Sequence, residues 1–370
     1  MKLSNTSIAG FEGRSVTDAD RGVLLTGLVG GACLLVAFGL FLSNSTLTVV
    51  PVSGFLAATA YGWFNHQAAT VKSVTFLATV ATTVILGLIS IFLIARSIPV
   101  FQHMGIRIFG LTEPVRVFGV TLIPGVGELW STSGDVYSLT PMIWGTLMTT
   151  VIAMLVAGPL GVAGAVFIAE IAPPTVRESV KPGIEILAGI PSIVYGWLGF
   201  VLISPFVYDH LGTPGLGNMA IVGVVIGLMA LPTVVSVAED ALTSVPNSMK
   251  DGSLALGATD WQTIKGITMP ASFSGVSAAV LLGVGRAVGE TMAATVILSN
   301  VVQLPEPLYN VFGNTISLTS LIASQYGNAD GMHMQALFAA GVVLFVSVMF
   351  LSIVSQAVES RMKRKLEGQA

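Results

Sequence analysis

Seven long apolar segments run through the chain and constrain its fold more than any other feature. A membrane-spanning helix needs about 20 apolar residues to cross roughly 30 Å of hydrocarbon, and hydropathy over windows of that length selects these segments. Charged residues make up only 9% of the 370 residues, whereas a soluble domain carries about 25%. The sequence therefore predicts an all-α, polytopic helical membrane protein. The seven segments are residues 23–42, 73–95, 143–169, 184–207, 219–242, 271–299 and 335–358.

A weaker apolar segment at residues 49–65 leaves the number of spans at seven or eight. It contains two glycines, a proline and a tryptophan, so three interpretations are open: it crosses the bilayer, re-enters it or lies at its interface. The first segment, 23–42, is too long for the apolar region of a signal peptide, and Glu12, Asp18 and Asp20 dilute its positive flank. We therefore expect it to be retained as a span.

Lys and Arg in the loops predict the orientation in the cell membrane, because they accumulate on the cytoplasmic side. The C-terminal tail, residues 359–370, holds the strongest positive cluster and is expected in the cytoplasm. Loops 300–334 and 208–218, which hold no Lys or Arg, then lie outside, and loops 243–270 and 170–183 lie inside.

The N-terminal half follows the charge rule less clearly. Loop 96–142 falls outside although it carries three arginines. Eight spans place the N-terminus inside, beside Lys2, Arg14 and Arg21, and seven spans place it outside. The charge rule favours eight.

Composition and missing motifs argue against several functional classes. The net charge of −3 gives no basic surface for nucleic acid. The single Cys33 excludes an intramolecular disulfide and a cysteine metal cluster, and none of the four histidines has metal-ligand spacing. The sequence holds no P-loop motif to cradle ATP phosphates and no H-E-x-x-H or G-x-S-x-G motif. We therefore expect no catalytic site, metal or cofactor on this chain.

One loop on the predicted cytoplasmic side has the sequence DGSLALGATDWQTIKGITMP. Asp251–Leu256 is expected to form a short helix, and Gly257 to break it, because glycine tolerates a left-handed backbone. Either Thr259 or Asp260 can cap a second helix over Trp261–Gly266. The prediction is a compact helix–turn–helix that projects from the membrane.

This loop also carries more apolar surface than a connector in water requires. Leu254, Leu256, Trp261 and Ile264 are expected on one face of it. Two interpretations are open: a protein partner covers this face, or the loop lies as an amphipathic connector on the lipid headgroups.

The spacing within the loop resembles the EAA loop of ABC-importer permeases, which reads E-A-A-x-x-x-G, nine residues, then I-x-L-P. The spacing matches throughout, although the first three letters differ and Met269 replaces the leucine. The resemblance implies that the loop, residues 250–266, inserts into a cleft on a separate ATPase subunit and transmits its closure. The residues predicted for this coupling loop are Asp251, Gly252, Ser253, Gly257, Trp261, Ile267 and Pro270.

Further segments resemble the permeases of phosphate-specific ABC importers, those of the PstC type in particular. These segments are residues 141–173, 185–200, 283–300 and 313–341. The resemblance implies a type I permease that transports phosphate, with a six-helix core and one or two extra N-terminal spans. It also implies a second permease of the PstA type, a PstB-type ATPase dimer that holds ATP and Mg, and an external phosphate-binding protein of the PstS type.

On this reading the chain has four parts. They are an added membrane element at residues 1–72, the first core span and a long external loop at 73–142, the permease core at 143–358 and a basic cytoplasmic tail at 359–370.

Two charged residues inside a predicted span are candidates for the substrate pathway. Arg286 and Glu290 are four residues apart, so one helical face would hold both as an ion pair. Charges inside a membrane are costly and usually face a polar path, and an arginine suits the oxygens of phosphate. The alternative is a structural ion pair between packed helices. The resemblance favours the pathway, with Glu290 holding Arg286 in place.

Other charges lie at the ends of the predicted spans. Glu170 closes one span and Glu185 opens the next, near a helix N-terminus. They are candidates for a gate or, more simply, charges at the membrane interface. Glu239 and Asp240 are interpreted as solvated charges at the membrane surface, and Pro191 is expected to kink its span.

Three alternatives remain open from the sequence. The substrate is phosphate or another oxyanion such as sulfate or molybdate, since one arginine does not choose among them. A secondary transporter without an ATPase would show a duplicated, inverted architecture, and no such duplication is visible. A membrane-bound enzyme is disfavoured by the missing catalytic groups.

Overall fold

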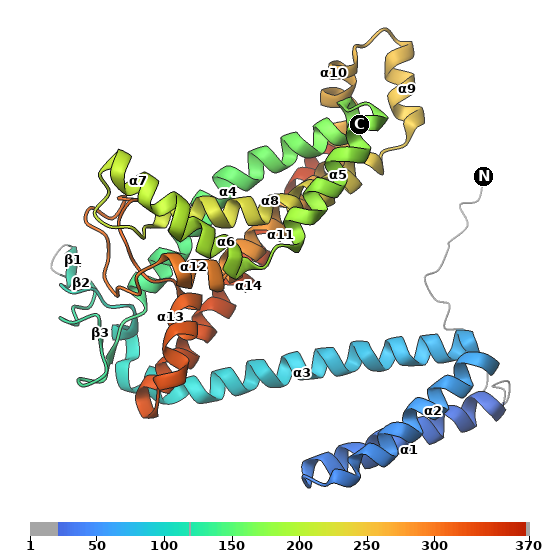
Figure 1. Ribbon diagram of the computed structural model, residues 1–370, viewed down its shortest axis with the longest axis horizontal. Coiled ribbons are helices and arrows are strands. Elements are labelled where there is room, and N and C mark those ends of the chain that lie inside the picture. The colour runs from blue at the N-terminus through green and yellow to red at the C-terminus, as the bar shows by residue number, and fades with distance from the viewer. Residues whose placement is uncertain (1–20, 118–119, 368–370) are drawn as a thin grey trace. The chain divides into compact units, whose positions relative to one another are not determined.

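The computed structural model describes residues 21–117 and 120–367 (Figure 1). The chain divides into two compact units, residues 1–91 and 92–370. The long helix α3 (Gln67–Met104) contains the boundary between them. The N-terminal flank with Lys2 and Arg14, which bears on orientation, lies outside the described residues.

Helices α1 and α2 of the first unit pack closely against each other. A Cβ added at Gly54 would lie 3.0 Å from the Sγ of Cys33, and one at Gly30 would lie 3.7 Å from the ring of Phe55. Small residues allow this approach, which matters because lipid gives no hydrophobic drive between helices. The elements of this unit are α1 (Arg21–Leu42), the 3₁₀ turn η2 (Thr46–Thr48), α2 (Val49–Asn65) and the first part of α3.

The weak apolar segment at 49–65 forms one continuous helix, and Thr46–Asn65 is long and apolar enough to cross a membrane. Helix α1 has 22 residues, of which Thr26–Leu42 form an apolar helix. Within the described residues, seven helical stretches meet the length and composition of a span. They are Thr46–Asn65, Gln67–Phe109, Thr140–Ile171, Ser192–Leu211, Met219–Thr243, Asp260–Gly289 and Gly331–Val354.

The region predicted as a long loop, 96–142, is largely ordered. Helix α3 continues to Met104, and a short turn and two small β-hairpins follow. In the first hairpin Val115 pairs with Ile123, and in the second Trp130 pairs with Tyr137. These elements are η3 (Gly105–Phe109), β1 (Val115–Val117), β2 (Val120–Ile123), β3 (Trp130–Ser131) and β4 (Val136–Tyr137).

Three helices form the centre of the second unit: α4 (Thr140–Val166), α8 (Met219–Thr243) and α11 (Met269–Gly289). Helix α8 is the most buried of the candidate spans. Glycines set the distance between these helices, since a Cβ added at Gly223 of α8 would lie 2.5 Å from the Cβ of Ile152 in α4. This close contact fixes the positions of the surrounding elements.

Two of the predicted spans are broken rather than continuous. The segment 184–207 divides at Ile190 and Pro191, both of which have extended backbone. Proline removes a helical hydrogen bond and clashes with the preceding turn, so the kink expected at Pro191 is a full break. The segment 271–299 divides at Glu290. The resulting elements are α5 (Pro174–Gly189), α6 (Ser192–Leu198), the π-helix η5 (Gly199–Ile203), α7 (Ser204–Leu211) and α12 (Met292–Ile297).

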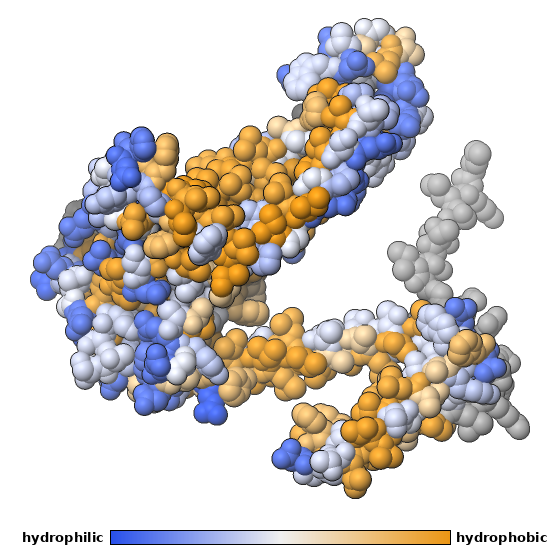
Figure 2. Space-filling view, viewed as in Figure 1, coloured by the Kyte–Doolittle hydropathy of each residue, from blue (hydrophilic) through white to orange (hydrophobic). Residues whose placement is uncertain are grey.

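The second unit ends with α13 (Leu318–Gln325), the turn η7 (Tyr326–Asn328) and α14 (Gly331–Glu367). In Figure 1 the β-hairpins and α7 lie at one end of this unit, and α9 and α10, described below, lie at the other. Figure 2 shows a largely apolar surface between these two more polar ends. This pattern is what a membrane-spanning bundle requires.

The glycine contacts in the centre lead to a stability prediction. Gly223→Ala is expected to lower the melting temperature of the detergent-purified chain, because overpacking a tight contact costs about 1–3 kcal/mol. Gly87→Ala in α3 is the control, since a Cβ there meets nothing within 4 Å and alanine favours helix by about 1 kcal/mol. Equal melting temperatures for the two variants would contradict the packing described here.

Candidate functional site

The predicted helix–turn–helix is present between α8 and α11. Helix α9 (Asn247–Ala255) leads to Gly257, whose φ of +88° lies in the left-handed region. Helix α10 (Asp260–Thr263) then begins at Thr259, and a capping box joins Thr259 and Gln262. Of the two candidate caps, Thr259 is therefore the one used.

The second helix of this motif does not stop at Gly266. It continues through the π-helix η6 (Ile264–Thr268) into α11, where Pro270 lies in the first turn. The hydroxyl of Thr263 donates a 2.9 Å hydrogen bond to the hydroxyl of Ser253, which joins α10 to α9. One arm of the motif is thus continuous with a central helix of the bundle.

The apolar face of the motif is exposed, with one correction. Leu256 is 91% exposed and Trp261 is 64% exposed, while Leu254 is also exposed. Ile264, which was expected on the same face, is buried at 5% because it belongs to the π-helix packed at the base. Asp251 and Gly252 lie on the exposed surface as well. The surface available to a partner therefore centres on Leu256 and Trp261.

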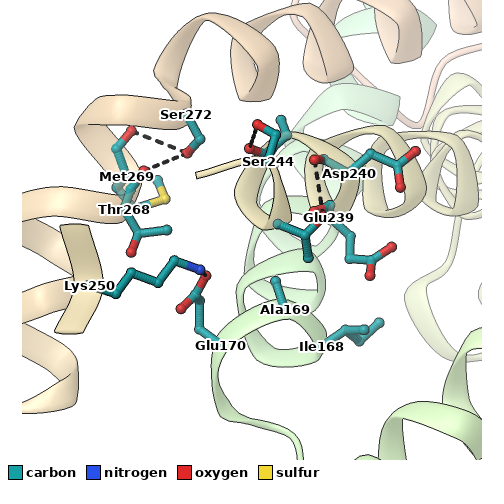
Figure 3. A network of polar contacts seen from close by, with 12 residues as sticks. Ile168, Ala169, Glu170, Glu239, Asp240, Ser244, Lys250, Thr268, Met269 and Ser272 are labelled. Carbon is teal, nitrogen blue, oxygen red and sulfur yellow. Dashed lines mark hydrogen bonds and ion pairs between the residues drawn. The ribbon is translucent and has the colours of Figure 1, made fainter. Parts of the chain in front are cut away.

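Glu170 does not lie free at the membrane interface. It belongs to the π-helix η4 (Phe167–Ile171) at the end of α4, and its carboxylate accepts a 2.7 Å ion-pair hydrogen bond from Lys250 Nζ of α9 (Figure 3). The two side chains are 9% and 16% exposed. No local pattern in the sequence indicates the role of Lys250, since its partner is 80 residues away and helix packing brings the two together.

Glu239 is also paired rather than solvated, which corrects a second prediction. It is 5% exposed in α8, and it accepts a 2.8 Å hydrogen bond from Lys181 Nζ of α5. This hydrogen bond raises the pKa of Lys181, so the lysine keeps its charge. Asp240, the next residue, is exposed as expected.

Glu185 does not lie at a helix N-terminus. Helix α5 begins at Pro174 and ends at Gly189, so Glu185 is near its C-terminal end. The expected favourable interaction with a helix N-terminus is therefore absent. Glu185 lies instead beside Lys181 in the lining of a cavity of about 280 Å³, which also includes Thr233 and Glu239.

Arg286 and Glu290 do not form the predicted ion pair. The helix ends at Gly289, so the spacing of four residues no longer places both side chains on one face. Glu290 instead accepts hydrogen bonds from the backbone N–H groups of Met292 (3.0 Å) and Ala293 (3.2 Å) at the start of α12. Arg286 Nη1 donates a 3.0 Å hydrogen bond to the hydroxyl of Thr233 in α8.

The described residues give Arg286 no carboxylate within ion-pair distance, because their two ion pairs are Lys181–Glu239 and Lys250–Glu170. A neutral hydroxyl from a neighbouring helix therefore orients the guanidinium. No sequence signal pointed to Thr233. It follows Pro232 in the middle of a buried helix and reads as a packing residue.

Side chains satisfy the backbone at both helix breaks. The Tyr195 hydroxyl donates to the carbonyl of Leu187 across the α5–α6 break (3.0 Å), and the Thr319 hydroxyl donates to the carbonyl of Glu290 (2.8 Å). A Cβ added at Gly196 of α6 would lie 2.7 Å from the Cα of Ala293 in α12, so these two short helices are in close contact. Irregular backbone at membrane depth occurs only inside protein or along a polar cavity.

A cavity of about 1050 Å³ is lined by residues 111–113, which precede β1, and by residues of the segment 299–314. Its lining includes the carboxylates Glu113 and Glu306 and no Lys or Arg among the described residues. The charges of this cavity do not suit an oxyanion. Arg286 is therefore the better candidate for anion contact.

The family of binding-protein-dependent transport system inner membrane components matches residues 161–364, more than half of the chain. The phosphate transport system permease protein PstC of Haemophilus influenzae is 33% identical over 276 residues, which cover 70% of this chain and 86% of that protein. The probable ABC transporter permease protein YqgH of Bacillus subtilis is 35% identical over 280 residues, 74% of this chain and 88% of that protein.

A third relative, a PstC of Xylella fastidiosa, is 36% identical over 256 residues, 64% of this chain and 78% of that protein. Among solved structures, a bacterial alginate ABC transporter in complex with its pentasaccharide-bound periplasmic protein has a TM-score of 0.53. That match covers 81% of this chain and 97% of the other at 15% identity, and it shows a shared fold.

The left-handed turn leads to a second prediction. Gly257→Ala is expected to speed backbone amide exchange in α9 and α10 several-fold, because a left-handed backbone costs an L-residue about 1 kcal/mol. Gly252→Ala is the matched control, since Gly252 is a helical residue of α9 with open space around it. Hydrogen–deuterium exchange measures both. Equal exchange in the two variants would show that the turn does not depend on Gly257.

Proposed function

Since the chain belongs to the family of binding-protein-dependent transport system inner membrane components, we propose that it is the permease subunit of an ATP-driven importer for inorganic phosphate. The relatives named PstC support the phosphate assignment. The observation that carries it within this chain is Arg286, an arginine near a helix break. Among the described residues, a hydroxyl and not a carboxylate holds it.

An arginine in this setting suits a transient anion station. Its guanidinium donates in a planar fork that matches phosphate oxygens. A carboxylate partner would compete with phosphate for those donors, whereas Thr233 fixes one donor atom and adds no negative charge. Glu290, the second predicted pathway residue, accepts hydrogen bonds from backbone N–H groups at the start of α12 and so stabilises the break that follows the helix of Arg286.

The α9–α10 motif is proposed as the site of coupling to an ATPase. Leu256 and Trp261 offer an exposed apolar surface at the tip of the motif, and the end of α14 lies toward the same end of the unit (Figure 1). Both would face the cytoplasm, in keeping with the positive tail. ATP and Mg would bind to the ATPase dimer, and closure of that dimer would move the motif.

The remaining partners follow from the same assignment. A second permease of the PstA type would complete the pathway, and an external phosphate-binding protein of the PstS type would deliver the anion. The chain itself would be a transport subunit that leaves ATP hydrolysis to its partner. Sulfate and molybdate are the competing substrates, because one guanidinium can donate hydrogen bonds to any tetrahedral oxyanion.

Removing Arg286 tests the pathway assignment. In proteoliposomes that hold the complete importer, Arg286→Ala is expected to reduce phosphate uptake at least about 100-fold, since charge-assisted hydrogen bonds to one arginine contribute about 1.5–3 kcal/mol each. Arg286→Lys keeps the charge but loses the fork, so it should retain part of the activity. Uptake of labelled phosphate at the parent rate by Arg286→Ala would refute the pathway role.

Thr233 provides a more selective test of the same site. Thr233→Val keeps the shape but removes the hydroxyl that orients Arg286, so we expect about a ten- to hundredfold loss of uptake, since a hydrogen bond to a charged group contributes about 1.5–3 kcal/mol. Thr295→Val in α12 is the control, because its hydroxyl donates a local hydrogen bond to the carbonyl of Thr291, the N-cap of the same helix. Equal uptake by the two variants would exclude the orienting role of Thr233.

A further inference from the structure

Four helices are joined by polar contacts at the end of the bundle that carries α9 and α10. Lys250 of α9 binds Glu170 at the end of α4, and Lys181 of α5 binds Glu239 of α8. Arg177 of α5 donates to two backbone carbonyls at the end of α4. Since α8 leads directly into α9, these contacts close a ring, which we call the polar ring. Its order is α9, η4 at the end of α4, α5, α8 and again α9.

Of the two ion pairs in the polar ring, the one between Lys250 and Glu170 is the more buried. Its side chains are 16% and 9% exposed. An exposed ion pair contributes little, but removal of one partner from a buried pair leaves a charge without compensation and is strongly unfavourable. Separating Lys250 from Glu170 therefore costs more free energy than separating an exposed ion pair.

Two other helices, α5 and α9, bind the end of α4. A displacement of α9 can therefore be transmitted to α4 through Lys250. The π-helix η4 leaves backbone carbonyls without the usual helical partners. Arg177 satisfies those of Ile168 (2.8 Å to Nε) and Ala169 (2.7 Å to Nη2). Glu170 follows directly, so its position is set by α5 through Arg177 and by α9 through Lys250.

The polar ring connects the loop to Thr233, the residue that binds Arg286. Glu239 and Thr233 lie on the same helix, six residues and so about 9 Å apart along its axis. Thr233 holds Arg286, which lies in α11, and α11 is continuous with α10 through η6. The loop therefore reaches Arg286 by two routes, one through the backbone of α10 and α11 and one through the polar ring.

We propose that the Lys250–Glu170 ion pair transmits movement of the α9–α10 motif to the helices of the bundle, and we call it the coupling tie. It makes α4, α5 and α8 follow any displacement of α9, so that Thr233 and Arg286 move together when the loop moves. Lys250 and Glu170 are positioning residues and do not touch the substrate. This inference rests on the proposed coupling of the loop to an ATPase, and it adds the path by which loop movement reaches the helices.

The test compares Lys250→Met with Lys72→Met in the complete importer, reconstituted in proteoliposomes. Lys72 lies in α3, outside the loop, is exposed and has no ion-pair partner among the described residues. The readout is phosphate imported per ATP hydrolysed. We expect Lys250→Met to lower this ratio at least about tenfold while ATP hydrolysis continues, and Lys72→Met to leave it within about twofold, as for a surface charge. The charge exchange Lys250→Glu with Glu170→Lys is expected to restore most of the ratio.

A second pair of variants covers the case in which Lys250→Met does not assemble. In a Cys33→Ser background, which removes the single native cysteine, Lys250→Cys and Glu170→Cys are joined by a short bifunctional thiol reagent. The unlinked protein should be uncoupled and the linked protein should recover its phosphate-to-ATP ratio, because the tie stays closed throughout the cycle. A linked protein that stays uncoupled or stops turning over would refute the proposal.

Two results separate this inference from the proposed function. If the unmodified importer does not import phosphate, the proposed function fails. If it does, but Lys250→Met imports phosphate at the parent ratio, then the function stands and the coupling tie is refuted.

Discussion

The absence of water in the membrane core is the constraint on which the rest of this structure depends. Every backbone N–H and C=O at that depth needs a partner inside the protein, yet two spans are broken, at Pro191 and at Glu290. Side chains supply the partners: Tyr195 and Thr319 donate to exposed carbonyls, and the Glu290 carboxylate accepts from the N–H groups of α12. The breaks are therefore stable features, and one of them ends the helix that carries Arg286.

The sequence predicted local structure well where a single residue decides it. Gly257 occupies the left-handed position that the loop requires, and Thr259 caps the helix that follows. The family and the membrane-spanning helical fold were also predicted, because apolar length and motif spacing are local patterns. The coupling role of the loop residues and the pathway role of Arg286 stay predictions.

The predictions that failed for Arg286 and Glu239 concern partners distant in the chain. Spacing alone paired Arg286 with Glu290, but the helix ends between them and Thr233 of another helix binds the arginine. The sequence predicted Glu239 to be a solvated charge at the end of a span, but Lys181 of α5 donates a hydrogen bond to its carboxylate. Helix packing places these side chains, and no periodicity in the sequence encodes which helices become neighbours.

Arg286 has a consequence for ions other than the substrate. Arg286 has no carboxylate partner among the residues that the structure describes. Such a positive charge repels cations from any path that it lines, as arginines do in other selective pores. If Arg286 lines the translocation pathway as proposed, protons and sodium ions meet a barrier there even while the pathway is empty. The membrane would then keep its ion gradients during a cycle that opens the permease alternately to each side. A neutralising glutamate at the position of Thr233 would weaken that barrier.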